Sequence, residues 1–158
     1  MSKKKPIVSP SFSYETLEET LDIKVKGSGM TIGIPKEIAF QENRVALTPD
    51  AVSVLVNNGH TVVLEHNAGD ASHFRDQEYS DAGAKIVYSR EEVFKAPILV
   101  KSAPVVEEDL PLLQMNQCII SPLHLSVLRQ EVLCTMMQKK ITAISFENLK
   151  DNSDSYPI

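Results

Sequence analysis

The chain has 158 residues, 42% hydrophobic and 23% charged, a composition typical of one globular domain that buries its own core. Its net charge of −5, with no basic stripe beyond residues 3–5, argues against a nucleic-acid partner. We expect neither a transmembrane helix nor a secretory signal, and therefore a cytoplasmic protein. The spacing of Cys118 and Cys134 fits no metal site, so we expect reduced thiols and no metal.

The sequence divides into three parts. Residues 1–29 are an N-terminal extension, where Leu17 and Leu21 lie one turn apart in a possible short helix over 11–23. This extension could pack on a neighbouring subunit or form a loosely ordered arm. Residues 30–150 are the main domain, and residues 151–158 are a polar lead-in to a further domain.

Short apolar runs alternate with amphipathic segments throughout the main domain. The runs predict strands, and the amphipathic segments between them predict helices. The expected strands cover 31–34, 61–65, 85–88, 98–101, 117–121 and 141–146. The expected helices cover 50–58, 76–82, 89–95, 107–113 and 126–139. This alternation predicts an α/β fold of three layers, a mainly parallel sheet with helices on both faces, of Rossmann or flavodoxin type.

Several helix ends carry local signals. Thr48 is placed to cap the first long helix, and Pro49 suits its first position because proline lacks the N–H that would be unpaired there. Gly59 suits a left-handed cap at the end of that helix. Ser89 and Glu92 match a capping box that would open the helix over 89–95.

Three side chains with useful chemistry follow expected strands. Arg44 comes after the first strand, Lys101 closes the fourth, and His124 follows the fifth. Parallel sheets bind ligands outside the carboxyl ends of their strands, so we expect all three at one rim. An arginine there can grip a carboxylate with its planar fork. A histidine there can move a proton, because its pKa lies near operating pH.

The residues Ile-Gly-Ile-Pro-Lys-Glu at 32–37 and Asn-Arg-Val-Ala-Leu-Thr-Pro at 43–49 resemble the N-terminal signature of the alanine dehydrogenase and nicotinamide nucleotide transhydrogenase family. Further blocks at 59–69, 82–87 and 119–125 extend the resemblance over about 30–148. It implies the substrate-side domain of an NAD-dependent enzyme that converts L-alanine to pyruvate and ammonium. It also implies a homo-oligomer with no membrane partner.

The resemblance assigns roles to two of these side chains. Arg44 would bind the substrate carboxylate, although it could instead be a surface arginine paired with Glu37 or Glu42. His124 would contact the substrate carbonyl and move a proton, or could simply cap the following helix. The family has a tyrosine where this chain has Pro122, so the resemblance does not extend to that part of the pocket wall.

Lys101 departs from the family pattern. The dehydrogenases usually show Lys-Val-Lys-Glu-Pro after the fourth strand, and the second lysine contacts substrate. Here the segment 100–104 is Val-Lys-Ser-Ala-Pro, which puts Ser102 at the position of that second lysine. Lys101 is the remaining candidate for catalysis and substrate binding, but alternation along a strand would point it to the opposite side.

The cofactor site is expected elsewhere. A nicotinamide site usually needs a glycine-rich turn between a strand and a helix, and the chain contains no GxGxxG. The resemblance places the NAD fingerprint in a second domain after residue 158, so we expect no cofactor-binding residue in this chain and no turnover by the chain alone.

Two other functions stay open. The first is the NAD(H)-side domain of a proton-translocating transhydrogenase α subunit, which the Ser-Ala-Pro of 102–104 favours. The second is a non-catalytic binding module left by a split gene.

Overall fold

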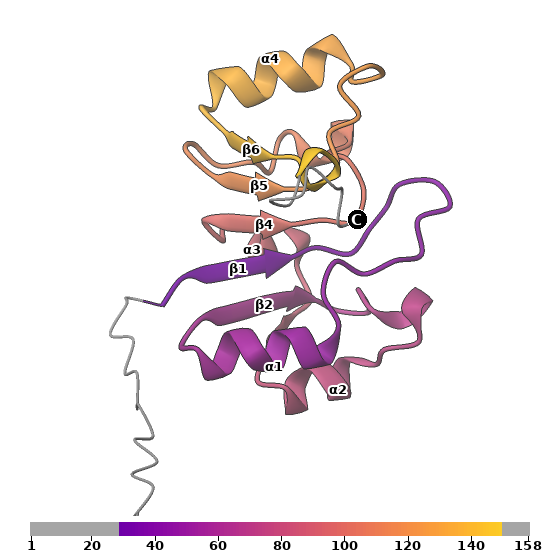
Figure 1. The fold of residues 1–158 in the computed structure, drawn as a ribbon, viewed down its shortest axis with the longest axis vertical. Coiled ribbons are helices and arrows are strands. Elements are labelled where there is room, and N and C mark those ends of the chain that lie inside the picture. Colours follow the sequence, from indigo (N-terminus) through magenta and orange to yellow (C-terminus); the bar gives the residue numbers. More distant parts are fainter. Residues whose placement is uncertain (1–28, 150–158) are drawn as a thin grey trace, which may run out of the picture.

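The computed structural model describes residues 29–149. The extension expected over 1–29, apart from residue 29, and the lead-in expected over 151–158 lie outside the described residues. The described part is a sheet flanked by helices, and its chain path is shown in Figure 1.

Six parallel strands form the sheet in the order β3-β2-β1-β4-β5-β6. Their bounds are β1 Thr31–Ile34, β2 Thr61–Glu65, β3 Lys85–Val87, β4 Ile98–Val100, β5 Cys118–Ile120 and β6 Thr142–Ile144. This is the doubly wound Rossmann order, in which the winding direction reverses between the first and fourth strands. The prediction of a mainly parallel sheet is confirmed.

Helices cover both faces of the sheet. They are α1 Pro49–Asn57, α2 Asp76–Asp81, α3 Arg90–Val93 and α4 Gln130–Gln138, with 3-10 turns η1 Asp70–Ser72, η2 Glu107–Asp109 and η3 Phe146–Asn148. Val62 and Leu64 of β2 pack in one core with residues of α1 and α2, whereas Val63 packs in another with residues of α3 and α4. The three-layer prediction is therefore confirmed. No helix within residues 29–149 is long and apolar enough to cross a membrane.

The predicted cap of α1 is also confirmed. The Thr48 hydroxyl accepts a hydrogen bond from the Ala51 N–H at 3.4 Å, and Pro49 occupies the first helical turn. Gly59 follows the helix with a φ of 85°, the left-handed conformation that glycine adopts without steric cost.

Three predicted helices are shorter than the sequence indicated. The helix expected over 126–139 begins only at Gln130, because a turn closed by the Val127 N–H and the His124 carbonyl precedes it. The helix expected over 107–113 is the short η2 turn. The helix expected over 89–95 covers only Arg90–Val93. The capping box expected at Ser89 is wrong, since the Ser89 hydroxyl donates to Glu91 instead of capping α3.

Gly33 allows α3 to approach the sheet. A Cβ at this position would lie 2.7 Å from the Val93 carbonyl oxygen and 2.9 Å from both the Ala96 Cβ and a Leu99 methyl. The close contact with a backbone carbonyl leaves no flexible group that could move aside. The lack of a side chain at Gly33 therefore allows the short distance between β1 of the sheet and the helix layer that contains α3.

We predict that Gly33→Ala lowers the free energy of unfolding by about 1–3 kcal/mol, the usual cost of overpacking a core. Denaturant unfolding would measure this. Gly59→Asn is the control, because nothing lies within 4 Å of a Cβ there and asparagine tolerates the left-handed conformation. A Gly33→Ala protein as stable as the wild type would contradict the packing described here.

Candidate functional site

The crevice between β1 and β4 is the place where Rossmann-type sheets bind ligands, at the carboxyl ends of the strands. Glu37 follows β1 and Lys101 follows β4. The Lys101 Nζ donates to Glu37 Oε2 at 2.9 Å, and the two side chains are only 1% and 5% exposed. A buried ion pair therefore joins the two strands at the point where the sheet reverses.

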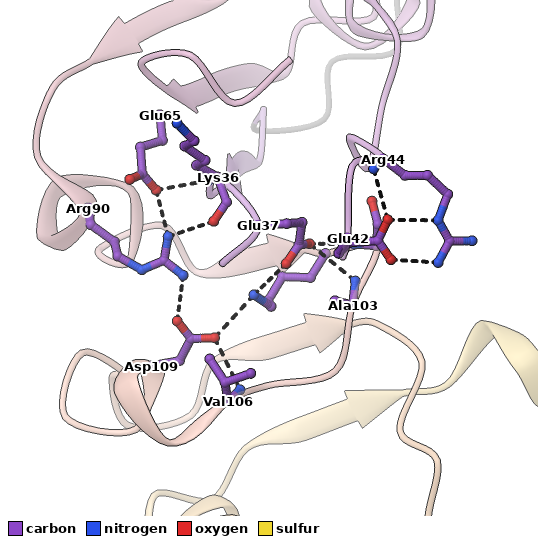
Figure 2. A network of polar contacts seen from close by, with 11 residues as sticks. Lys36, Glu37, Glu42, Arg44, Glu65, Arg90, Ala103, Val106 and Asp109 are labelled. Carbon is purple, nitrogen blue, oxygen red and sulfur yellow. Dashed lines mark hydrogen bonds and ion pairs between the residues drawn. The ribbon is translucent and has the colours of Figure 1, made fainter. Parts of the chain in front are cut away.

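The pair continues into a chain of buried and half-buried charges. Lys101 Nζ also lies 3.1 Å from Asp109 Oδ2, and Asp109 Oδ1 accepts from Arg90 Nη2 at 2.6 Å. Arg90 Nη1 donates to Glu65 Oε2 at 2.9 Å. We call Glu37, Lys101, Asp109, Arg90 and Glu65 the ion-pair chain (Figure 2). Opposite charges alternate along it, which offsets the cost of removing each from water.

Backbone groups complete the ion-pair chain and attach the first loop to it. Glu37 Oε1 accepts from the N–H groups of Ser102 at 2.6 Å and Ala103 at 3.2 Å. The Lys36 N–H donates to Glu65 Oε2 at 2.8 Å, and the Lys36 carbonyl accepts from Arg90 Nη1 at 2.7 Å. The start of the loop over 35–48 is thus held through both side chain and backbone.

We predict that Lys101→Met lowers the free energy of unfolding by about 3–5 kcal/mol, because it leaves two buried carboxylates without their shared cation. Lys85→Met is the matched control, since the Lys85 side chain is 62% exposed and its ion pair with Glu92 lies on the surface. Equal stability losses in the two variants, measured by denaturant unfolding, would show that Lys101 is not a structural cation.

Arg44 extends from the same loop into solvent. Its side chain is 76% exposed, while that of its partner Glu42 is 12% exposed. Arg44 Nε donates to Glu42 Oε1 at 2.9 Å, Nη2 donates to Oε2 at 2.7 Å, and the Arg44 backbone N–H donates to Oε1 at 2.8 Å. Arg44 is therefore exposed and paired with Glu42, one of the two partners considered from the sequence. Its role as a carboxylate ligand stays a prediction.

The loop is also held on either side of Arg44. The Ser72 hydroxyl donates to the Asn43 carbonyl at 2.7 Å and accepts from the Val45 N–H at 3.1 Å. Farther along, the buried Tyr79 hydroxyl donates to the Leu47 carbonyl at 2.8 Å. Burial raises the pKa of Tyr79 to about 12, so this hydroxyl remains a donor at all ordinary pH values. These contacts fix the backbone that carries Arg44.

The Glu42–Arg44 contact has an electrostatic signature. The hydrogen bonds from Arg44 lower the pKa of the Glu42 carboxyl from 4.5 to about 2. Because the folded-state pKa is depressed, the contact stabilises the protein above about pH 4.5 and is lost as pH falls toward 2.

We predict that NMR titration of the wild-type protein gives a pKa of about 2 for Glu42, and that Arg44→Ala returns it toward 4.5. A Glu42 pKa that does not change in Arg44→Ala would contradict the contact.

His124 follows β5 and is held by Glu147 of η3. The Glu147 carboxylate accepts the His124 backbone N–H at 2.9 Å and lies 2.8 Å from its Nδ1. Burial raises the pKa of Glu147, but hydrogen bonds from the His124 and Leu123 backbone and from Ser145, together with the charge of His124, lower it by more, so the net pKa lies below 4.5. His124 has a φ of 45°, a strained conformation that functional sites often retain.

A cavity of about 410 Å³ lies beside His124, between the segment after β4 and the segment that leads into α4. Its walls are mostly apolar and include Val105, Leu123 and Val132. Neither Arg44 nor Lys101 lines it. The cavity thus provides an apolar wall next to the imidazole rather than a pocket shared by the three predicted residues.

Arg44, Lys101 and His124 follow β1, β4 and β5 in the chain, so each comes after the carboxyl end of a strand. The arrowheads of the labelled strands point to the same side in Figure 1. Each is held by a different acid: Arg44 by Glu42, Lys101 by Glu37 with Asp109, and His124 by Glu147. Lys101 is 1% exposed and is surrounded by its partners. The assignment of Lys101 to catalysis stays a prediction. Its contacts with Glu37 and Asp109 are those of a residue that holds the loop and strand ends together.

Sequence reasoning missed Asp109, Arg90 and Ser72. Arg90 falls within the helix expected over 89–95, and Asp109 within the helix expected over 107–113. A usable signal for this cluster exists, because charged residues stand at the ends of two apolar strands, Glu65 in β2 and Lys101 after β4. Because β2 and β4 flank β1 on either side, their carboxyl ends lie at the same edge of the sheet, where buried charges need partners. No such signal marks Ser72.

Within residues 29–149, no cluster of three or more histidine, cysteine or acidic side chains is arranged to hold a metal ion. Gly33, the glycine nearest the switch point, lies within β1 and packs against Val93, Ala96 and Leu99, so it does not form a phosphate-binding turn.

The family model described as alanine dehydrogenase/PNT, N-terminal domain, matches residues 33–158. Alanine dehydrogenase 2 of Staphylococcus aureus strain USA300 is 35% identical over 129 residues, which are 82% of this chain and 34% of that protein. The chain thus spans about a third of the length of the curated relatives it matches.

Two solved structures share the fold. An L-alanine dehydrogenase superposes with a TM-score of 0.77 at 38% identity, covering 81% of this chain and 35% of that one. A transhydrogenase from Sinorhizobium meliloti gives a TM-score of 0.69 at 26% identity, covering 74% and 35%.

Proposed function

The chain belongs to the alanine dehydrogenase/PNT N-terminal domain family, and from this membership we propose that it forms the substrate side of an NAD-dependent enzyme that interconverts L-alanine with pyruvate and ammonium. One observation carries the proposal. The family arginine, Arg44, stands exposed beside the switch point on a loop held at several places. The proposal extends to a cytoplasmic homo-oligomer, as the sequence resemblance implies.

In this proposal Arg44 binds the carboxylate of pyruvate or alanine. A guanidinium offers five N–H donors in a rigid plane, so it can hold Glu42 with one edge and a substrate carboxylate with another. The ion-pair chain fixes the start of the loop and Ser72 fixes its middle. The loop backbone therefore loses little conformational entropy when substrate binds. A preset arginine orients the keto acid at low entropic cost.

His124 is proposed to hold and move the proton at the substrate carbonyl or amine. Its Nδ1 faces Glu147, which leaves Nε2 as the ring nitrogen available to substrate. A carboxylate on one ring nitrogen fixes the tautomer and orientation of the ring, the arrangement that general acid–base catalysis by histidine needs. NAD, when bound, accepts the hydride, and we assign none of its binding to the described residues.

A transhydrogenase-type domain is the second candidate. The Ser-Ala-Pro of 102–104 favours it, and so does the similarity to the Sinorhizobium meliloti transhydrogenase. Alanine-dependent reduction of NAD by the intact protein separates the two, because a transhydrogenase takes no amino-acid substrate.

We predict that Arg44→Ala in the intact protein raises the KM for pyruvate about tenfold to a hundredfold, as expected for the loss of charge-assisted hydrogen bonds. Steady-state assay of reductive amination would measure it. Arg75→Ala is the control, because Arg75 is an exposed arginine before α2. An unchanged KM in Arg44→Ala would remove Arg44 from the site.

A further inference from the structure

We propose that Glu42 is a positioning residue for Arg44, whose guanidinium it holds by Nε and Nη2 so that the edge formed by Nη1 and Nη2 stays open for the carboxylate of a small keto acid. This inference rests on the proposed function and adds a residue to its site. It assigns to Glu42 a role in substrate binding without direct contact with substrate.

The contact geometry defines which edge is free. Glu42 accepts from Nε at 2.9 Å and from Nη2 at 2.7 Å, a two-point contact at one edge of the guanidinium. Within residues 29–149, the structure gives Nη1 no hydrogen-bond partner. Figure 2 shows this third nitrogen of Arg44 on the side away from Glu42. The Nη1–Nη2 edge can therefore take a second carboxylate in the same two-point manner.

The burial of the two partners argues against simple competition. The Glu42 side chain is 12% exposed and the Arg44 side chain 76% exposed, so the acid is largely covered while the cation faces solvent. The Arg44 backbone N–H also holds Glu42 at 2.8 Å. A ligand that displaced Glu42 would leave a mostly buried carboxylate short of hydrogen bonds, which is costly. A ligand at the free edge leaves every existing bond in place.

The surrounding charges allow a second carboxylate to approach. Glu37 is close enough to raise the pKa of Arg44 together with Glu42, which contributes most. However, Lys101 compensates the charge of Glu37 at 2.9 Å. Glu42 thus reduces the positive charge available to substrate and in return fixes the direction of the guanidinium. These two effects have opposite signs in a binding measurement, which makes the inference testable.

The experiment measures the dissociation constant for pyruvate in the intact protein with NADH present, for Glu42→Gln, Glu42→Ala and Arg44→Ala. We expect Glu42→Ala to weaken pyruvate binding about tenfold, because a freely rotating arginine must be ordered by the ligand. Glu42→Gln should weaken it less, since the amide keeps one acceptor. Glu131→Gln, an exposed glutamate of α4, is the matched control.

A spectroscopic readout separates positioning from stability. The Arg44 Nε–H should give a slowly exchanging NMR signal in the wild type that is lost in Glu42→Ala, and the Tm of each variant, measured in parallel, reports its loss of stability. If Glu42→Ala fails to fold, the isosteric Glu42→Gln decides.

Tighter pyruvate binding in the Glu42 variants would show that Glu42 competes with substrate, and unchanged binding would show that it does not position Arg44. Either result overturns this inference alone, provided that Arg44→Ala still weakens binding. If Arg44→Ala binds pyruvate as the wild type does, or if the wild type binds none, the proposed function fails and this inference fails with it.

Discussion

The ion pair between Lys101 and Glu37 lies where the sheet reverses its winding, and it ties the first loop to the fourth strand. A Rossmann-type sheet leaves a crevice at this point. In this protein a buried cation joins the two walls of the crevice, and Asp109, Arg90 and Glu65 extend the contact across the neighbouring strand ends. Removing one member of the ion-pair chain leaves its partners with a buried charge that is not compensated, so the stability of each of the five residues depends on the others.

The candidate site separates support from chemistry. The supporting charges are buried or half-buried and paired with one another, whereas Arg44 and His124 are exposed and each is paired with a single acid. Such a division suits a loop that must be rigid and still meet a ligand. Lys101 has a supporting role in this arrangement, because it pairs with Glu37 and Asp109. The position of the family lysine, just after β4, is occupied by Ser102. The Ser102 hydroxyl is buried and has no hydrogen-bond partner within residues 29–149.

Local signals in the sequence were enough for most of the fold. The run of β-branched and apolar residues over 61–65 predicts β2 with its bounds, and Thr48 with Pro49 predicts the start of α1, because these preferences act over a few residues. The start of α4 could not be predicted from local preferences. The turn at His124 that precedes α4 is held by a hydrogen bond from the His124 backbone N–H to Glu147, a residue distant in the sequence. The ion-pair chain was missed for the same reason, since its members meet only after the strands align.

The central claim is that Lys101 and Glu37 interact directly and that the first loop depends on this contact. A double-mutant cycle with Glu37→Gln and Lys101→Met, followed by denaturant unfolding, tests it most directly. The account predicts an interaction free energy of about 1–3 kcal/mol between the two sites, as found for residues in direct contact within one ion-pair network. Additive effects of the two substitutions, within about 0.5 kcal/mol, would contradict it.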